Sequence, residues 1–242
     1  MLKFLLGLVI SSLVLTMMLA IGGMTYLGMT PLSKFFGTGQ QDLGITVTKA
    51  ETQAAMQKIG TEIVALPANT PDDQGFKLEG RKPADFTMNS QELSAHSNNR
   101  PWKNYPLKNV QIKIQPDGTI EGSAMLIIDK AMPYAMGLGY SEAQIRDAMK
   151  KYSIPPFTVP IYVKGKGNVL DNQATVAASF VKIGGITVPQ ETVEQANAAA
   201  SIVLTNLMYT HRDAFDCQSL NFDNGQMHFK GFVAAKEYVV VN

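Results

Sequence analysis

The sequence contains a single cysteine, Cys217. One cysteine cannot form an intramolecular disulfide, and a thiolate metal cluster would need several. No histidine or basic cluster stands beside Cys217 in the sequence to lower the pKa of its thiol. We therefore expect a small buried hydrophobic residue at this position. The folded chain must rely on core burial rather than on covalent cross-links.

An excess of charge of one sign is also absent. The chain has 21 Lys and Arg residues against 20 Asp and Glu residues, and neither sign forms a block. Proteins that bind nucleic acid through its phosphates need clustered positive charge. The composition therefore predicts no nucleic-acid partner.

Catalytic signatures are missing as well. The three histidines, His96, His211 and His228, have no partner at i+4, and the chain contains no H-E-x-x-H motif. It also contains no G-x-S-x-G, no S-x-x-K and no phosphate-binding loop. Asp213 and Asp216 follow His211, but a helix end with mixed charge accounts for them. We expect no catalytic residues, no metal ligands and no cofactor, and hence a protein that is not an enzyme.

Residues 4–27 form one long apolar run, FLLGLVISSLVLTMMLAIGGMTYL, without a charged side chain. The run exceeds the roughly 20 residues that a helix needs to cross the hydrocarbon core of a membrane. We therefore predict a transmembrane anchor within residues 1–30. The alternative is a cleaved secretory signal, whose best cleavage candidate, Met18-Leu19-Ala20, has a large residue where a small one is required. Lys3 precedes the run and only Lys34 follows closely, which favours a body outside the cytoplasm, at the cell membrane.

Residues 31–44 are predicted to form a linker, and residues 45–242 an extracytoplasmic α+β domain. Residues 45–48 have a strand pattern, and a capping box from Thr48 to Glu51 opens a helix expected to last to about Ala65. A second capping box runs from Asn89 to Glu92. The two boxes indicate either a duplicated unit or a coincidence, because capping boxes are common. Between them, residues 67–83 predict a loop with one short strand at 76–78.

Alternating apolar residues predict three hairpins. The first covers residues 110–128 around the turn Pro116-Asp117-Gly118. The second covers residues 158–188, with a bend at Gly165 and Gly167 and a turn at Asp171-Asn172. The last has the turn Asn224-Gly225, which pairs Phe222 with Met227 and Leu220 with Phe229. One-sided alternation of this kind is typical of an antiparallel sheet.

Two further helices and one apolar loop complete the prediction. The longest soluble helix is expected at residues 190–212, with an apolar stripe at i, i+3, i+4 and i+7 spacing. A capping box at residues 141–144 predicts a helix that carries Ile145, Ala148, Met149 and Tyr152 on one face. The stretch AMPYAMGLGY at residues 131–140 has no helical period, and we expect an irregular apolar loop there.

Several of these segments resemble a known family. They are FTMNSQEL at residues 86–93, the hairpin at 110–128, VPIYVKG at 159–165 and IGGITVP at 183–189 before the long helix. Together with the amino-terminal anchor, they resemble the YpmS-like membrane-anchored proteins and, more distantly, the LmeA-like extracytoplasmic lipid-binding proteins. The second resemblance implies a tubular lipid-binding arrangement, in which a curved antiparallel sheet wraps a long helix. The capped unit at residues 45–65 departs from the pattern, and no family binding residue can be carried over.

The predicted fold is thus an amino-terminal transmembrane helix plus a mainly antiparallel curved sheet packed on one long helix. Our first functional hypothesis is a lipid or other apolar ligand bound without catalysis between sheet and helix. The expected ligand-binding residues are Val203, Leu204, Leu207, Met208, Tyr134, Met136 and Leu138. The alternative is a solid-cored scaffold with a protein partner in the cell envelope. A cavity of at least ~300 Å³ along residues 203–208 would favour lipid binding, whereas a packed core would favour the scaffold.

Overall fold

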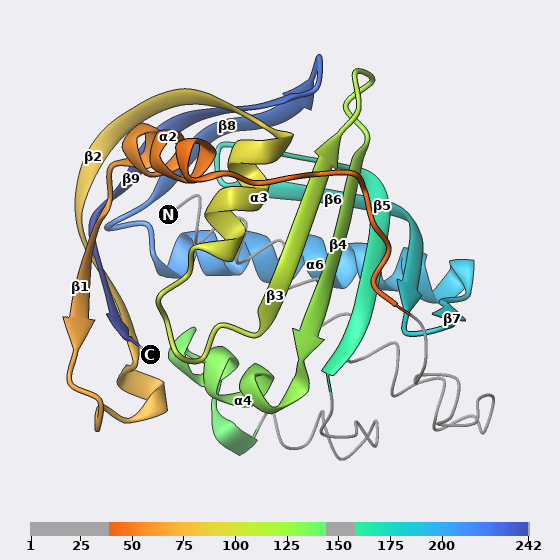
Figure 1. The fold of residues 1–242 in the computed structure, drawn as a ribbon. Coiled ribbons are helices and arrows are strands. Elements are labelled where there is room, and N and C mark those ends of the chain that lie inside the picture. The colour runs from red at the N-terminus through yellow and green to blue at the C-terminus, as the bar shows by residue number, and fades with distance from the viewer. Residues whose placement is uncertain (1–38, 144–157, 242) are drawn as a thin grey trace.

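The computed structural model describes residues 39–143 and 158–241 (Figure 1). The predicted anchor at residues 4–27, and Ile145, Ala148, Met149 and Tyr152 of the helix predicted after the third capping box, lie outside these ranges. Within them, no helix combines the length and the apolar character that a membrane crossing requires.

In the described part of the chain, nine strands form one strongly curved sheet, and the hydrogen-bonded path through it runs β1-β9-β8-β5-β4-β3 (Figure 1). β2 pairs with β9, β6 with β5, and β7 with β6. All described pairs are antiparallel except β1 with β9. The strands are β1 (Glu62–Leu66), β2 (Phe76–Asn89), β3 (Leu107–Ile114), β4 (Ile120–Ile127), β5 (Thr158–Leu170), β6 (Gln173–Ile183), β7 (Ile186–Thr187), β8 (Asp216–Asp223) and β9 (Gln226–Val240).

Four α-helices lie among the described residues: α2 (Lys49–Ile59), α3 (Ser90–Asn98), α4 (Ile128–Gly137) and α6 (Gln190–Thr210). A short 3-10 helix, η2, covers Asp72–Gln74. In Figure 1, α6 crosses behind the strands from β7 toward β9. The predicted fold class, a mainly antiparallel curved sheet with one long helix, is confirmed at this level.

The predicted hairpins are present. β3 and β4 are joined through the Pro-Asp-Gly turn, and Phe222 pairs with Met227 and Leu220 with Phe229 across β8 and β9. Asp171 and Asn172 both have positive φ, as the tight turn between β5 and β6 requires. The register of β5 against β6 shifts between Lys164 and Gly165, which confirms the predicted irregularity there.

Helix α3 covers the outer edge of β3 with a row of polar side chains. Ser90 Oγ accepts from the Ile114 N–H at 2.9 Å, and Ser94 Oγ accepts from the Ile112 N–H at 2.8 Å. Asn98 accepts from the Val110 N–H at 2.8 Å and donates to the Val110 carbonyl at 2.7 Å. Four helix residues rise about 6.0 Å and two strand residues about 6.6 Å, so a helix running against a strand can repeat this contact.

Helix α6 covers the outer edge of β6 in the same way. Its polar row consists of Asn197, Ser201 and Thr205, which accept from the backbone N–H groups of Ala178, Val176 and Ala174, each at 3.0 Å. Asn197 also donates to the Ala178 carbonyl at 2.9 Å. Both exposed edges of this part of the sheet are therefore closed by helices. We call these two rows of bonds the α3 ladder and the α6 ladder.

The helix predicted from Thr48 to about Ala65 is too long. Helix α2 ends at Ile59 because Gly60 adopts the left-handed conformation with φ of 62°. The residues that follow form β1, which pairs in parallel with the carboxyl-terminal part of β9. The amino end is as predicted, with the Thr48 N–H donating to Glu51 Oε2 at 2.7 Å.

One strand prediction near the amino end was wrong, and another was too short. Residues 45–48 form no strand; the segment from Gly39 onward lies across β3 and β4 and is bonded by side chains, including the Leu43 N–H to Gln111 Oε1 at 2.6 Å. Conversely, the expected short strand at 76–78 is the start of the 14-residue β2, which pairs with β9 along its length. Pro83 does not interrupt β2, since a strand at a sheet edge tolerates a missing N–H.

The irregular apolar loop predicted at residues 131–140 was also wrong. Residues up to Gly137 belong to helix α4, which contains Pro133. Pro133 and the small residues around it hid the helical pattern, but Ala131 and Tyr134 lie one turn apart and are both buried. The helix packs on η2 and on the aromatic residues near Trp102.

Candidate functional site

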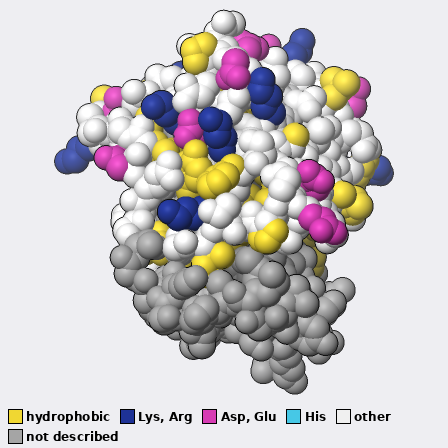
Figure 2. All heavy atoms as spheres, turned by 90° about the vertical axis from the view of Figure 1, so that its right-hand side faces the viewer, with side chains coloured by type: hydrophobic (Ala, Val, Ile, Leu, Met, Phe, Trp, Pro, Cys, Tyr) yellow, Lys and Arg dark blue, Asp and Glu magenta, His cyan; other side chains and the backbone are white. Residues whose placement is uncertain are grey.

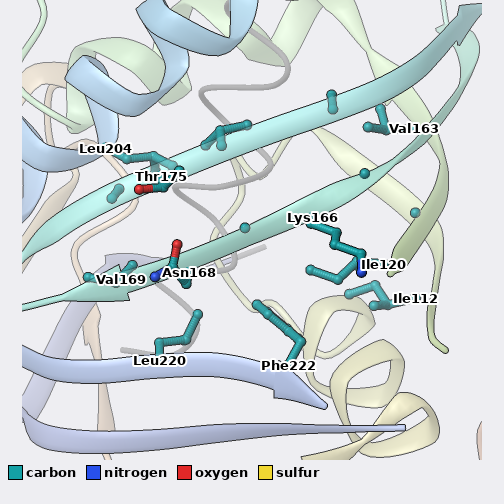
Figure 3. Close-up of a pocket in the computed structure, with 16 residues that line it drawn as sticks. Ile112, Ile120, Val163, Lys166, Asn168, Val169, Thr175, Leu204, Leu220 and Phe222 are labelled. Carbon is teal, nitrogen blue, oxygen red and sulfur yellow. The ribbon is translucent and has the colours of Figure 1, made fainter. Parts of the chain in front are cut away.

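An apolar pocket lies between the sheet and α6 (Figure 3). Its walls come from β3, β4, β5, β6, β8 and α6, and its volume is about 120 Å³. The large apolar side chains around it are Ile112, Ile120, Val163, Val169, Leu204, Leu220 and Phe222. We call this space the α6 pocket.

Gly122 leaves room in the floor of the α6 pocket. It stands between Ile112 on β3 and Val163 on β5 in the cross-strand register. Directly paired residues in an antiparallel sheet project to the same face, so a side chain at Gly122 would point to the pocket side. A Cβ built there meets nothing within 4 Å. The missing side chain therefore contributes to the empty space.

Gly165 allows β5 to approach β6 closely and does not create empty space. A Cβ at this position would stand 2.5 Å from the Ala178 Cα and 2.5 Å from the Ala177 carbonyl oxygen. Such contacts are far too short, so only glycine fits. Both Gly165 and Gly167, the predicted bend, line the α6 pocket.

The α6 ladder holds the rim of the pocket. Ala174, Val176 and Ala178 of β6 all line the pocket, and these are the residues whose N–H groups the ladder binds. Because the ladder fixes β6 against α6, it also fixes the distance between Leu204 and the sheet. The helix thus shapes the pocket through polar bonds as well as through its apolar stripe.

The predicted site residues occupy two separate places. Of the α6 residues, Leu204 lines the pocket, whereas Leu207 and Met208 are buried in the core and Val203 packs half-buried against it. The residues at 134–138 lie on or just after α4: Tyr134 and Leu138 are buried, and Met136 is half-buried. The described lining of the α6 pocket includes none of these α4 residues.

A packed aromatic cluster joins these two places. The Tyr134 ring lies 4.7 Å from that of Trp102, which stacks on Phe76 at 5.1 Å. Phe76 in turn meets His211, the C-cap of α6, edge-on at 6.2 Å. Rings at these separations attract one another beyond simple burial. The end of α6 is therefore packed solidly against α4 through aromatic side chains.

Sequence reasoning missed most of the pocket lining, above all Gly122. The sequence contained a signal for Gly122, because a glycine inside a strand often marks a site where a ligand or another backbone approaches closely. The side chains on β5 and β8, such as Val169 and Leu220, carried only the general signal of an apolar strand face. Which strands would face α6 depends on the crossing of distant segments, and alternation alone does not show it.

The size of the α6 pocket limits what it can hold. Sites for drug-sized ligands usually measure about 300–1,000 Å³, and this pocket has about 120 Å³. The criterion for a whole lipid is thus not met along residues 203–208. A dry apolar cavity of about 150 Å³ in another protein holds benzene. The α6 pocket therefore suits a small apolar ligand or the end of a longer chain.

Titratable side chains on β4 and β5 are held by hydrogen bonds. Tyr162 donates to Glu121 at 2.7 Å, and burial together with this bond raises the pKa of Tyr162 to about 12. Lys166, on the pocket lining, donates to the Asp117 carbonyl at 2.8 Å. Across residues 39–143 and 158–241, no group of three His, Cys, Asp or Glu side chains is placed to hold a metal ion.

Cys217 is fully buried, as predicted. Burial raises the pKa of its thiol to about 12, with smaller contributions from Asp216 and Asp171. Its backbone N–H donates to Asn172 Oδ1 at 2.8 Å, which ties β8 to the β5–β6 turn.

No family model, no curated protein and no solved structure matches the chain. The proposals below therefore rest on the residues and geometry of this chain.

Some apolar side chains remain on the surface. Leu170 and Ile202 are each 60% exposed, and Phe180 is 37% exposed. Figure 2 views the molecule from the side where β7 lies in Figure 1, and hydrophobic side chains gather near the centre of this face among Lys or Arg side chains. Gathered apolar side chains of this kind are typical of contact surfaces.

Proposed function

We propose that the domain binds the end of an acyl chain, or a similarly small apolar group, in the α6 pocket and performs no chemistry on it. The predicted helix at residues 4–27 would tether the domain to the membrane from which such a chain comes. The observation that carries the proposal is the pocket itself, which sheet and helix enclose with apolar walls.

The expected affinity is modest. Each buried methylene contributes about 0.8 kcal/mol, so five of them contribute about 4 kcal/mol, the free energy of a millimolar complex. Ordering the chain lowers this further. The domain would therefore hold a chain end only transiently unless other contacts add to the binding. Transient binding suits a protein that senses or passes on a lipid.

A pocket-filling variant tests the proposal. Gly122→Ile adds a side chain on the pocket side without a close contact at Cβ. A fluorescent fatty acid is titrated against the full-length protein and against this variant. We expect saturable binding by the unaltered protein and at least tenfold weaker binding by Gly122→Ile.

Gly39→Ile is the matched control, because a Cβ at Gly39 also meets nothing within 4 Å and Gly39 does not line the pocket. This control should bind as the unaltered protein does. Equal binding by Gly122→Ile and Gly39→Ile would refute the pocket as the site.

The second candidate function is a scaffold in the cell envelope. Leu207, Met208, Tyr134 and Leu138 are packed rather than lining a large cavity, which favours this alternative. Crosslinking in intact cells would then capture one constant protein partner. Capture should be unchanged by Gly122→Ile if the partner, not a ligand in the pocket, is what the domain recognises.

A further inference from the structure

A second hollow, separate from the α6 pocket, lies beside β3. Its volume is about 570 Å³, within the usual range for ligand sites. Arg100, Trp102 and Tyr105 form one part of its wall, and Ile45 and Val47 of the amino-terminal segment form another. We call it the Arg100 pocket. None of its described lining residues lines the α6 pocket.

The Arg100 side chain is only 3% exposed, yet its hydrogen-bonding capacity is only partly used. Nη2 donates to Glu237 Oε1 at 2.9 Å. Nε and Nη1 are buried and have no partner among the described residues. A buried donor without an acceptor is unfavourable by an amount comparable to a lost hydrogen bond, more so for a charged group. The unpaired Nε and Nη1 N–H groups therefore favour a bound acceptor.

Two more donors without partners belong to the same wall. Trp102 Nε1 and the Tyr105 hydroxyl are both buried and lack a hydrogen-bond partner in the described part of the chain. The Arg100 guanidinium also lies 5.5 Å from the centre of the Tyr105 ring. Buried polar groups are normally paired. Four donor atoms on three neighbouring lining residues thus have no acceptor in the described part of the chain. An external acceptor-rich group can supply one.

The charged side chains that line the Arg100 pocket are all positive. Lys108 and Lys130 line it, and no Asp or Glu is among its described lining residues. Arg100 is balanced by Glu237, whereas no described ion pair involves either lysine. Two surplus positive charges match a phosphate monoester, which carries about −1.5 to −2 at neutral pH. Hydrogen bonds from a guanidinium to phosphate oxygens are charge-assisted and therefore strong.

From these observations we infer that the Arg100 pocket binds a phosphate group. The Arg100 guanidinium donates through N–H groups that Glu237 leaves unpaired, Trp102 and Tyr105 supply neutral donors, and Lys108 and Lys130 balance the charge. The wall made by Ile45 and Val47 belongs to a segment without regular secondary structure. The inference does not depend on the α6 pocket.

The only tryptophan of the chain lies in this wall, so its fluorescence reports on the site directly. The full-length protein is titrated with inorganic phosphate, and separately with dihexanoyl phosphatidic acid and dihexanoyl phosphatidylcholine. We expect a saturable change in Trp102 emission with phosphate that weakens as salt is raised. Tighter binding of the phosphatidic acid than of phosphate would identify a lipid headgroup as the source, and equal binding would identify a free phosphate compound.

The double variant Lys108→Gln/Lys130→Gln should weaken phosphate binding by about tenfold. Lys49→Gln/Lys113→Gln removes the same charge from exposed positions outside the pocket and should leave binding unchanged. Arg100→Lys keeps a charge for Glu237 but loses the additional guanidinium N–H donors, and should also weaken binding while thermal unfolding confirms a folded protein. The inference is overturned if the unaltered protein shows no saturable response to phosphate, or if both double variants respond equally.

Discussion

Two helices close the sheet edges by the same hydrogen-bond pattern, but their surroundings differ. In the α3 ladder, Ser94 is fully buried and Ser90 nearly so. In the α6 ladder, Asn197, Ser201 and Thr205 are only half-buried. All three strand residues bound by α6 line the α6 pocket, whereas of those bound by α3 only Ile112 does. Helix α3 also contacts α2.

The two ladders therefore use the same hydrogen-bond pattern in two different surroundings. An uncovered strand edge is a template for aggregation, and both ladders remove that edge. In the α3 ladder Ser90 and Ser94 are buried, so an unpaired group beside them is strongly unfavourable. The α6 ladder lies beside empty space, where a small shift changes the pocket. Disrupting the first should therefore affect stability, and disrupting the second should affect ligand binding.

The largest effect on stability is expected from Ser94→Ala. Ser94 accepts from the Ile112 N–H and donates to the Ser90 carbonyl. Its loss leaves a buried N–H unpaired and should lower the free energy of unfolding by about 1–3 kcal/mol, measured by urea denaturation. Ser97→Ala is the control, because among the described residues buried Ser97 bonds only the Leu93 carbonyl of its own helix. Equal effects of the two substitutions would show that the ladder contributes nothing specific.

A smaller loss of stability is expected from Ser201→Ala. Water can replace part of the bond to the half-buried Val176 N–H, so the free energy of unfolding should fall by only about 0.5–1.5 kcal/mol. Its effect on fatty-acid binding should exceed that of Ser94→Ala, because all three strand residues bound by the α6 ladder line the pocket, against Ile112 alone for the α3 ladder. The comparison between the ladders fails if Ser94→Ala weakens binding more than Ser201→Ala does.

Thiol labelling of Cys217 can sharpen the comparison further. Native labelling should be slow, since the side chain is fully buried and its pKa is about 12. Ser201→Ala should accelerate labelling more than its loss of stability accounts for, because Ala174 and Asn172 connect the α6 ladder to Cys217 through the β5–β6 hairpin. Labelling rates that follow global stability alone in both serine variants would contradict local opening at α6.

The smallest effect on stability is expected from His211, at the carboxyl end of α6. Burial lowers the pKa of His211 below its ordinary value. The neutral form is thus favoured in the folded state, and its contribution to stability is present above the unfolded pKa of about 6.5 and is lost as the pH falls below it. His211→Gln should reduce the loss of stability between pH 7 and pH 5. Urea midpoints across this range check the expectation, and an unchanged pH dependence would contradict it.

Local chemistry made several elements predictable. The turns at Asn224-Gly225 and Asp171-Asn172 fixed both the hairpins and their registers, since a two-residue turn with positive φ allows few pairings. Helix α6 was predicted to within two residues of its carboxyl end because its apolar stripe persists over several turns. In each case the determining contacts lie close together in the sequence.

Elements that depend on distant partners were harder to predict. β1 is a strand because residues 236–240 lie beside it, and β2 extends through Gly80 and Pro83 because β9 pairs with it along its length. The candidate site shows the same limit: Leu204 was predicted from its stripe, but Gly122 required knowledge of which strands cross α6. The ladders were also missed, since serine and asparagine at a spacing of four read as an ordinary polar helix face.

The arrangement of β9 has a consequence for synthesis in the cell. This strand pairs with β2 on one side and with β8 and then β1 on the other. Until residues 226–240 leave the ribosome, β1 and β2 have no strand to pair with in the final sheet, and their backbone groups stay open to other chains. Contacts that span so much of the sequence also make folding slow. The nascent domain would therefore be a client for chaperones that shield extended segments until the last strand arrives.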